Sequence, residues 1–304
     1  MISPPSYNKI LTLGARGAEN VLRGSVVVQE KVDGSQFRFG VNEDGELVFA
    51  SHHKDIYAPD VGVFTAGVDS VTDAGDYLCG LGNDTYFFGE YLAKPHQNTL
   101  TYERVPRGHV VVFDALVKGS NEWETYDRLY AHADAMRMEI VPLLQVGEAD
   151  LEFLQNLVTG TQSFLGGTMI EGVVIKNYRE TVLIGSRLHN VFAKLVRAEF
   201  KERNIKTQKR ESSKGRLLDF LDSFGTEARW RKAVQRARED GDLEDIPRDI
   251  GMLVRLIQQD VAEEETENIK EELLNIYKKD VMRHAVRGFA EWYKEQLLTR
   301  MEEL

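Results

Sequence analysis

The apolar residues of this sequence follow two different periods, and the change between them falls near residue 204. Before it, short runs rich in β-branched and aromatic residues predict strands. The predicted strands are Val26–Glu30, Phe37–Val41, Leu47–Ala50, Thr85–Phe88, Val110–Asp114, Gly172–Ile175 and Val191–Lys194. Helical spacing lies between these runs, at residues 9–22, 61–79, 125–138 and 149–159. Because helices are interspersed with strands that form hairpins, we expect an α+β domain of antiparallel sheets flanked by helices, not a doubly wound parallel sheet.

After Phe200 the apolar residues recur at i, i+3 and i+4, which predicts helices. The predicted helical segments are Leu217–Leu221, Trp230–Ala237, Ile250–Val261 and Ile269–Leu298. We therefore expect a domain of residues 1–204 and an all-helical C-terminal domain of residues 205–304. Trp230, Trp292 and Tyr293 are predicted to pack inside the helical domain.

The charge of the chain argues at first sight against a nucleic-acid partner. The net charge is −11 at pH 7, and binding to phosphate is largely electrostatic. The distribution of charge matters more than its sum, however. Lys206–Arg238 holds ten Lys/Arg and four Asp/Glu, so its basic residues could follow an RNA backbone or form a solvated helix face. Eight of the ten are the candidates for this role: Lys206, Lys209, Arg210, Lys214, Arg216, Arg229, Arg231 and Lys232.

Cysteine content and hydropathy limit the compartment. The single cysteine, Cys79, cannot form an internal disulfide, and no cysteine cluster predicts zinc. No stretch approaches the ~20 apolar residues of a membrane span, and the N-terminus lacks the apolar core of a signal peptide. We expect a soluble cytoplasmic monomer with no membrane contact.

The segment Glu30-Lys31-Val32-Asp33-Gly34-Ser35 follows one apolar strand and precedes another. Burial at a strand end, and neighbouring cations, can lower the pKa of a lysine, and the neutral amine is a nucleophile. Gly34 permits a tight turn that keeps this amine near a ligand. Taken alone, the segment is equally typical of a solvated lysine at the end of a strand.

Charged residues at the edges of later apolar runs form an ordered series with this segment. They occur in Phe87-Phe88-Gly89-Glu90, Val112-Phe113-Asp114, Glu171-Gly172-Val173-Val174-Ile175-Lys176 and Phe192-Ala193-Lys194. In this order the segments resemble the nucleotidyltransferase motifs of covalent polynucleotide ligases and mRNA capping enzymes. The closest resemblance is to ATP-dependent RNA ligases of the type of the second RNA ligase of bacteriophage T4, because helices and not a β-barrel follow the motifs.

The resemblance implies a role for each matching residue. Lys31 would be the nucleophile, and Lys176 and Lys194 would contact the α-phosphate. The remaining nucleotide contacts would come from Glu30, Asp33, Gly34, His52, Lys54, Glu90, Phe113 and Glu171. Among these, Glu90 would hold the ribose hydroxyls and Phe113 would stack on adenine. Asp114 and Glu171 would contact Mg²⁺ or Mn²⁺, which offsets phosphate charge during phosphoryl transfer.

The sequence departs from the family pattern at two places. Where the family usually has a basic residue that contacts phosphate, this chain has Ser51-His52-His53-Lys54, and His52 and Lys54 both stay candidates. The family often has two lysines spaced two apart in the last motif, and here Lys194 is followed by Val196. Arg197 is a candidate replacement for the second lysine.

The resemblance predicts an enzyme that joins RNA 3′-hydroxyl and 5′-phosphate ends. Nicked duplexes are among its possible substrates, and RNA repair is its expected setting. Two other readings stay open. The first is a DNA ligase with the same chemistry. The second is a noncatalytic RNA-binding protein with a decayed nucleotidyltransferase domain, which the two departures favour.

Overall fold

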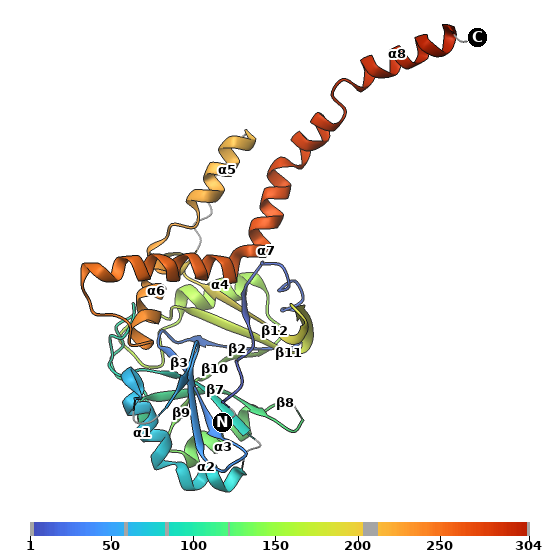
Figure 1. The fold of residues 1–304 in the computed structure, drawn as a ribbon. Helices are drawn as coiled ribbons and strands as arrows, with labels where there is room; N and C mark the ends of the chain where they lie inside the picture. The colour runs from blue at the N-terminus through green and yellow to red at the C-terminus, as the bar shows by residue number, and fades with distance from the viewer. Residues whose placement is uncertain (1–2, 58–59, 83–84, 121, 203–211, 303–304) are drawn as a thin grey trace. The chain divides into compact units, whose positions relative to one another are not determined.

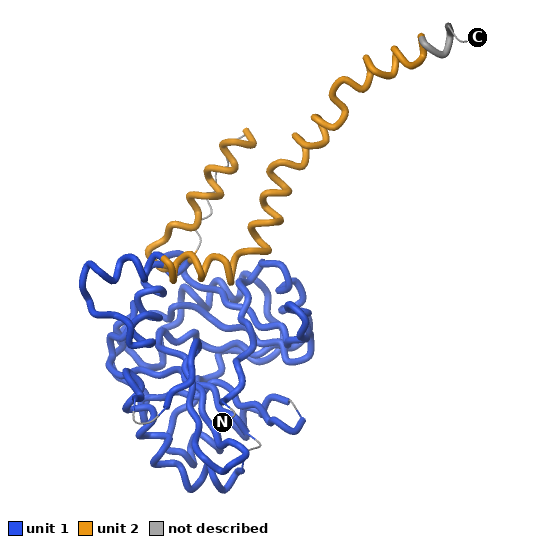
Figure 2. The backbone as a smooth tube through the Cα atoms, viewed as in Figure 1, with its two compact units in different colours: residues 1–201, 230–254 blue, residues 202–229, 255–304 orange. Residues whose placement is uncertain are grey.

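The structure is a computed structural model that describes residues 3–57, 60–82, 85–120, 122–202 and 212–302 (Figure 1). Its chain forms two compact units (Figure 2). Unit 1 comprises residues 1–201 and 230–254, and unit 2 comprises residues 202–229 and 255–304. The predicted domain boundary near residue 204 lies outside the described residues, as does the basic run 206–210.

One sheet of unit 1 carries the strand that ends at Lys31. Its strand order is β1 (Ile10–Thr12), β12 (Arg187–Val196), β11 (Gly172–Ile184), β2 (Val26–Lys31) and β10 (Leu143–Gly147). All neighbours are antiparallel except β1, which pairs with β12 in parallel. Alternate residues of β2 face opposite sides. Val28 therefore packs with α4 (Leu151–Gly160) in a buried core, while Gln29 and Lys31 share the other face.

The second sheet of unit 1 carries the strand with Glu90. Its strand order is β5 (Asp55–Ile56), β4 (Leu47–Ser51), β3 (Ser35–Val41), β6 (Thr85–Tyr91), β7 (Val110–Val117) and β8 (Glu122–Trp123), with β9 (Glu139–Ile140) parallel to β7. A core of aromatic and aliphatic side chains joins one face of this sheet to three helices. These are α1 (Thr65–Asp73), α2 (Gly75–Leu81) and α3 (Tyr126–Ala135), with the short turns η1 (Gly62–Phe64) and η3 (Arg107–His109) beside them.

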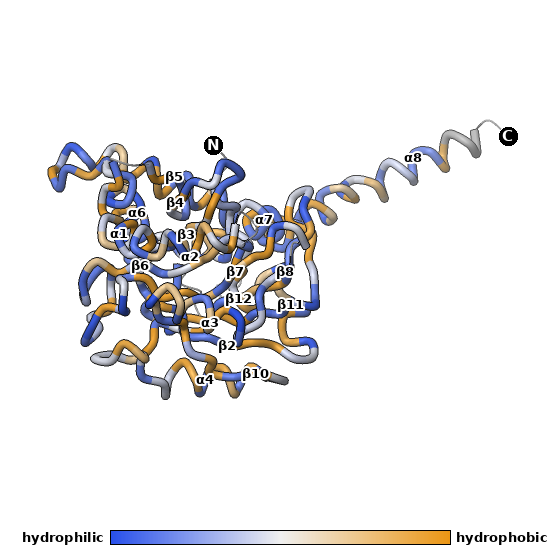
Figure 3. The backbone as a smooth tube through the Cα atoms, turned by 90° about the horizontal axis from the view of Figure 1, so that it is seen from below, coloured by the Kyte–Doolittle hydropathy of each residue, from blue (hydrophilic) through white to orange (hydrophobic). Residues whose placement is uncertain are grey.

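The described residues from Ser213 onward contain only helices as regular elements. They are α5 (Ser213–Asp222), α6 (Glu227–Glu239), η5 (Pro247–Asp249), α7 (Ile250–Ala285) and α8 (Phe289–Glu302). Before them, the short turn η4 (Ala198–Phe200) follows the last strand, β12. The fold is thus α+β with antiparallel sheets and a long C-terminal helical region, as predicted. Along α8, hydrophilic and hydrophobic turns follow one another (Figure 3). No helix among the described residues is long and apolar enough to cross a membrane.

Three predictions about the elements are wrong. Residues 9–22 form β1 and turns instead of a helix. The long C-terminal helix breaks at Gly288, where φ is +82°, and not between residues 261 and 269. Trp230, Trp292 and Tyr293 are about half exposed rather than packed inside. Helical periodicity identifies an apolar face, but it does not say whether another element covers that face.

Candidate functional site

The site is built around Lys31, the last residue of β2. Register pairs Lys31 with Gly172 on β11, so Glu171 lies just beyond the paired residues. The Lys31 Nζ is 2.8 Å from the Glu171 Oε2, and the Lys31 side chain keeps 28% of its exposure. The Lys31 side chain is therefore partly exposed, and its amine is ion-paired.

The electrostatics of Lys31 differ from the expectation. Burial lowers the pKa of Lys31, but the charges of Glu171 and Glu90 outweigh burial and raise the pKa above its ordinary value. The predicted lowering of this pKa is therefore wrong, because carboxylates surround the amine where neighbouring cations were expected. Lys31 is thus an ammonium group at neutral pH.

Glu90 lies in the same cluster, on β6. Its Oε1 accepts a hydrogen bond of 3.1 Å from the Gly34 N–H. Burial is the largest cause that raises the pKa of Glu90 to about 8, and the charges of Glu239 and Glu171 raise it further, against the opposing charge of Lys31. The structure thus brings together Lys31, Glu90 and Glu171.

Position 34 requires a glycine, because the backbone of β6 passes too close to leave room for a side chain. A Cβ at this position would lie 2.6 Å from the Tyr91 carbonyl oxygen and 2.7 Å from the Glu90 Cγ. Asp33, next to it, accepts hydrogen bonds of 2.8 and 2.7 Å from the N–H groups of Thr99 and Leu100. Asp33 therefore fixes the loop that follows β6, and its contact with a nucleotide stays a prediction.

Glu30 faces the opposite side of β2 from Lys31. Its carboxylate accepts a 3.1 Å hydrogen bond from the Phe164 N–H, and burial raises the pKa of Glu30 to about 7. The structure does not bring the Glu30 side chain to the amine of Lys31. A nucleotide contact of Glu30 stays a prediction.

Asp114 and Lys176 form a separate buried cluster. The Lys176 Nζ is 2.8 Å from the Asp114 Oδ2 and donates to the Phe113 carbonyl oxygen at 2.8 Å. The hydroxyls of Tyr7 and Tyr178 also donate to the Asp114 carboxylate, at 2.5 and 2.9 Å. Burial lowers the pKa of Lys176, and the Asp114 charge opposes this effect. This ion pair links β7 to β11, and the predicted phosphate and metal contacts of its members remain predictions.

Lys194 and Arg197 lie near Glu171. Lys194 pairs in register with Val174, and its charge opposes the burial that raises the pKa of Glu171. The Arg197 backbone N–H donates to the Glu171 carbonyl oxygen at 3.0 Å, and its side chain pairs with Glu199 at 3.2 Å. Arg197 therefore helps to hold the Glu171 backbone in this structure.

The turn between β4 and β5 presents the two histidines and Lys54. The rings of His52 and His53 lie edge to face, with centroids 4.4 Å apart. The Lys54 Nζ donates to the Asp240 carbonyl oxygen at 2.5 Å. Burial, followed by the charges of His52, Arg236, Lys232 and Arg38, lowers the pKa of His53 to about 3. A phosphate contact of His52 or of Lys54 stays a prediction.

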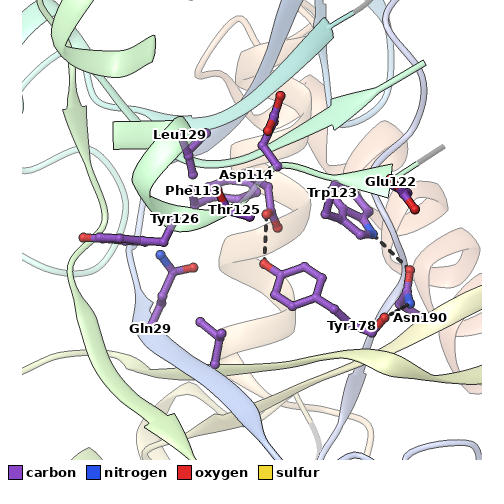
Figure 4. A pocket seen from close by; sticks show the side chains of 12 residues that line it. Gln29, Phe113, Asp114, Glu122, Trp123, Thr125, Tyr126, Leu129, Tyr178 and Asn190 are labelled. Carbon is purple, nitrogen blue, oxygen red and sulfur yellow. Dashed lines mark hydrogen bonds between the residues drawn. The ribbon is translucent and has the colours of Figure 1, made fainter. Parts of the chain in front are cut away.

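A pocket of about 520 Å³ opens beside Phe113 (Figure 4). Its other lining residues include Gln29, Trp123, Tyr126 and Tyr178. Gln29 is only 3% exposed; its Nε2 donates to the Val141 carbonyl oxygen at 2.9 Å, and its Oε1 has no hydrogen-bond partner among the described residues. The sequence analysis missed Gln29, although its position two residues before Lys31 on one strand was sufficient to place both on one face.

Metal binding here depends on few carboxylates. No group of three or more His, Cys, Asp or Glu residues suited to a metal occurs among the described residues. Mg²⁺ usually keeps several waters and takes one or two carboxylates, so Glu171 beside the Lys31 amine fits such an ion. Asp114 already binds one ammonium group and two hydroxyls.

Comparison with known proteins gives one family. Residues 24–196 match the family model described as RNA ligase. No curated protein matches the chain. Among solved structures it is similar to the Naegleria gruberi RNA ligase with PPi, at 12% identity and a TM-score of 0.48, over 63% of this chain and 55% of that one. A mutant of the same ligase with AMP and Mn gives 13% identity and a TM-score of 0.48, over 63% and 56%. The chain thus spans just over half the length of the structures it matches.

Proposed function

This chain belongs to the RNA ligase family, and from that premise we propose that it joins RNA 3′-hydroxyl and 5′-phosphate ends with ATP. The intermediate is a covalent adenylate on Lys31. The observation that carries the proposal is the partly exposed Lys31 side chain, whose amine lies 2.8 Å from Glu171 and feels the charge of Glu90. The same proposal includes a setting in RNA repair and a nicked duplex as one substrate. It also includes a cytoplasmic location and action as a monomer.

The proposed reaction has three steps. The Lys31 Nζ attacks the α-phosphorus of ATP; a nitrogen–phosphorus bond forms, pyrophosphate leaves, and the amine loses its proton. The AMP group then passes from Lys31 to the 5′-phosphate of an RNA end. Finally, the 3′-hydroxyl of the other end attacks that phosphate, AMP leaves, and a phosphodiester remains.

The protonation of Lys31 sets a condition on the first step. Carboxylates hold the pKa of Lys31 up, so the amine becomes a nucleophile only when their negative charge is offset. Mg²⁺ or Mn²⁺ held through Glu171 would supply positive charge for this purpose and for the α-phosphate. Lys194, whose charge acts on Glu171, adds positive charge from β12.

The pocket beside Phe113 supports ATP as the nucleotide. An aromatic ring such as Phe113 provides a stacking surface for a base. The Gln29 Oε1 is a buried acceptor without a partner among the described residues, and such an atom favours a ligand that donates a hydrogen bond. The 6-amino group of adenine is a donor, whereas guanine carries an acceptor oxygen at that position.

The direct test is label transfer from ATP that is labelled in its α-phosphate. The full-length protein with Mg²⁺ should become labelled, and the label should survive a denaturing gel. Lys31→Ala should abolish the label while the protein remains folded by circular dichroism. Folded, AMP-free protein that takes up no label would instead support the noncatalytic RNA-binding reading.

A nick-sealing assay separates RNA ligation from DNA ligation. One duplex carries RNA at the 3′-hydroxyl side of the nick, and the matched duplex is all DNA. We expect faster sealing of the RNA-containing nick. Equal rates on both duplexes would favour the DNA ligase alternative.

A further inference from the structure

Helix α6 reaches the turn that follows Lys31. The Gln235 side chain donates from Nε2 to the Gly34 carbonyl oxygen at 2.8 Å and to the Glu239 Oε1 at 2.7 Å. Residues 230–254 belong to unit 1, so these contacts lie within one compact unit. A segment about 200 residues further along the chain thus binds the backbone of the nucleotidyltransferase motif.

Gly34 connects Gln235 to Glu90 through two hydrogen bonds. The Gly34 carbonyl oxygen also accepts 2.7 Å from the Asn98 Nδ2, while the Gly34 N–H donates to the Glu90 Oε1. Gln235 of α6 therefore binds the peptide group that follows Gly34. The peptide group that precedes Gly34 binds the Glu90 carboxylate. A shift of α6 would change the position of the Glu90 carboxylate.

Glu239 acts on Glu90 through charge. It is only 8% exposed, and Gln235 and Ser35 donate hydrogen bonds to it. Burial raises the pKa of Glu239, and its charge is one of the causes that raise the pKa of Glu90. The other charged groups that act on Glu90 are Lys31 and Glu171.

We propose that Gln235 and Glu239 are positioning residues of the nucleotide site, which fix the Gly34 turn and the carboxylate of Glu90 from α6. This inference rests on the proposed function, because Glu90 is expected to hold the ribose of ATP. It gives Gln235 and Glu239 a part in lysine adenylation, a role that the sequence analysis did not predict for any residue of the helical region.

The first test compares Gln235→Ala with Arg238→Gln in the full-length protein. Arg238 lies on the same helix, is exposed, and its side chain forms a surface ion pair with Asp245 at 3.6 Å. Loss of a donor to a buried carbonyl should raise the KM for ATP in label transfer roughly five- to tenfold. The kcat should change by less than about twofold, because uniform binding is what is lost, and Arg238→Gln should match the wild type.

The second test measures the pH profile of Glu239→Gln. The new amide oxygen still accepts from Gln235, but the negative charge is gone. The pKa of Glu90 should therefore fall, and ionised Glu90 should persist to lower pH. We expect the acidic limb of label transfer to move down by roughly 0.5–1 pH unit. A merely structural role for Glu239 would not move this limb.

A binding measurement separates this inference from the proposed function. Affinity for an ATP analogue with a methylene group between the α- and β-phosphates is measured by calorimetry, which requires no catalysis. Suppose that the wild type takes up no label but binds the analogue more tightly than Gln235→Ala does. This result would support the α6 contact and contradict only the ligase chemistry. Equal affinities of the variants and the wild type, or a wild type that does not bind, would overturn the inference. If Gln235→Ala unfolds, the pH profile of Glu239→Gln decides.

Discussion

Lys31 shows how neighbouring charges can reverse the effect of burial on a single residue. The resemblance predicted that Lys31, Glu90 and Glu171 share a site, and the structure brings them together. The sequence could not give the balance between burial and charge, because that balance depends on strand register and on distances. Glu171 lies close to Lys31 because the next residue, Gly172, is the register partner of Lys31 on the neighbouring strand β11.

Glu171→Gln should lower the pKa of Lys31 by removing the strongest of the charges that raise it. More of the amine is then neutral at pH 9, so Lys31 should react faster with an amine-modifying reagent. Mass spectrometry of the modified peptide measures this rate across pH. Glu152→Gln, at an exposed position of α4, is the matched control and should leave the rate unchanged. A rate in Glu171→Gln equal to the wild-type rate would contradict the charge argument.

The Asp114–Lys176 pair should contribute strongly to stability. Both side chains are 2% exposed, and removal of one partner leaves the other charge buried. Lys176→Met should reduce the free energy of unfolding by about 3–5 kcal/mol, measured by urea denaturation. The double variant Asp114→Asn/Lys176→Met should lose less than the sum of the two single losses. Additive losses would show that the two groups do not interact.

At the scale of elements, local pattern predicted the strands that carry the motifs. β2, β3, β4, β6, β7, β11 and β12 all occur where β-branched and aromatic runs predicted them. The helix predicted over residues 9–22 failed because β1 gains its hydrogen bonds from β12, about 180 residues away. The sequence pattern contains no record of such a distant partner, and tertiary context overrides local propensity there. The contact of α6 with Gly34 was not predicted for the same reason.

The turn between β2 and β3 should tolerate no side chain at Gly34. A Cβ would meet the Tyr91 backbone and Glu90, so Gly34→Ala should destabilise the fold by about 1–3 kcal/mol and reduce label transfer. Gly80→Ala in α2 is the matched control, since a Cβ there meets nothing within 4 Å. That control should be neutral or stabilising by up to about 1 kcal/mol. Thermal denaturation of both variants provides the comparison, and equal stability would refute the close-contact argument.

At the scale of the whole molecule, the division into two units cuts across the helices. α6 and α7 each contain residues of both units, with the divisions after Arg229 and Val254. Within unit 2, the Arg229 side chain is fully buried and pairs with Asp260 and, at 3.0 Å, with Glu265. Arg229 is therefore enclosed by carboxylates and is not presented to an RNA backbone in this structure, unlike the expectation from its position in a basic segment.

Arg229→Met should destabilise unit 2 and leave the chemistry of unit 1 in place. The buried Glu265 and the partly buried Asp260 would each lose their ion pair with Arg229, at a cost of about 3–5 kcal/mol. Because chains with more than one compact unit need not unfold in a single transition, calorimetry should show an earlier transition, and proteolysis should cut α7 sooner within residues 255–285. Label transfer to Lys31 should stay within about twofold of the wild-type rate, because Gln235 keeps its own contacts in unit 1. If label transfer in Arg229→Met were lost together with intact α7 during proteolysis, the two units would not be independent. The buried Arg229 cluster would then be required for adenylation.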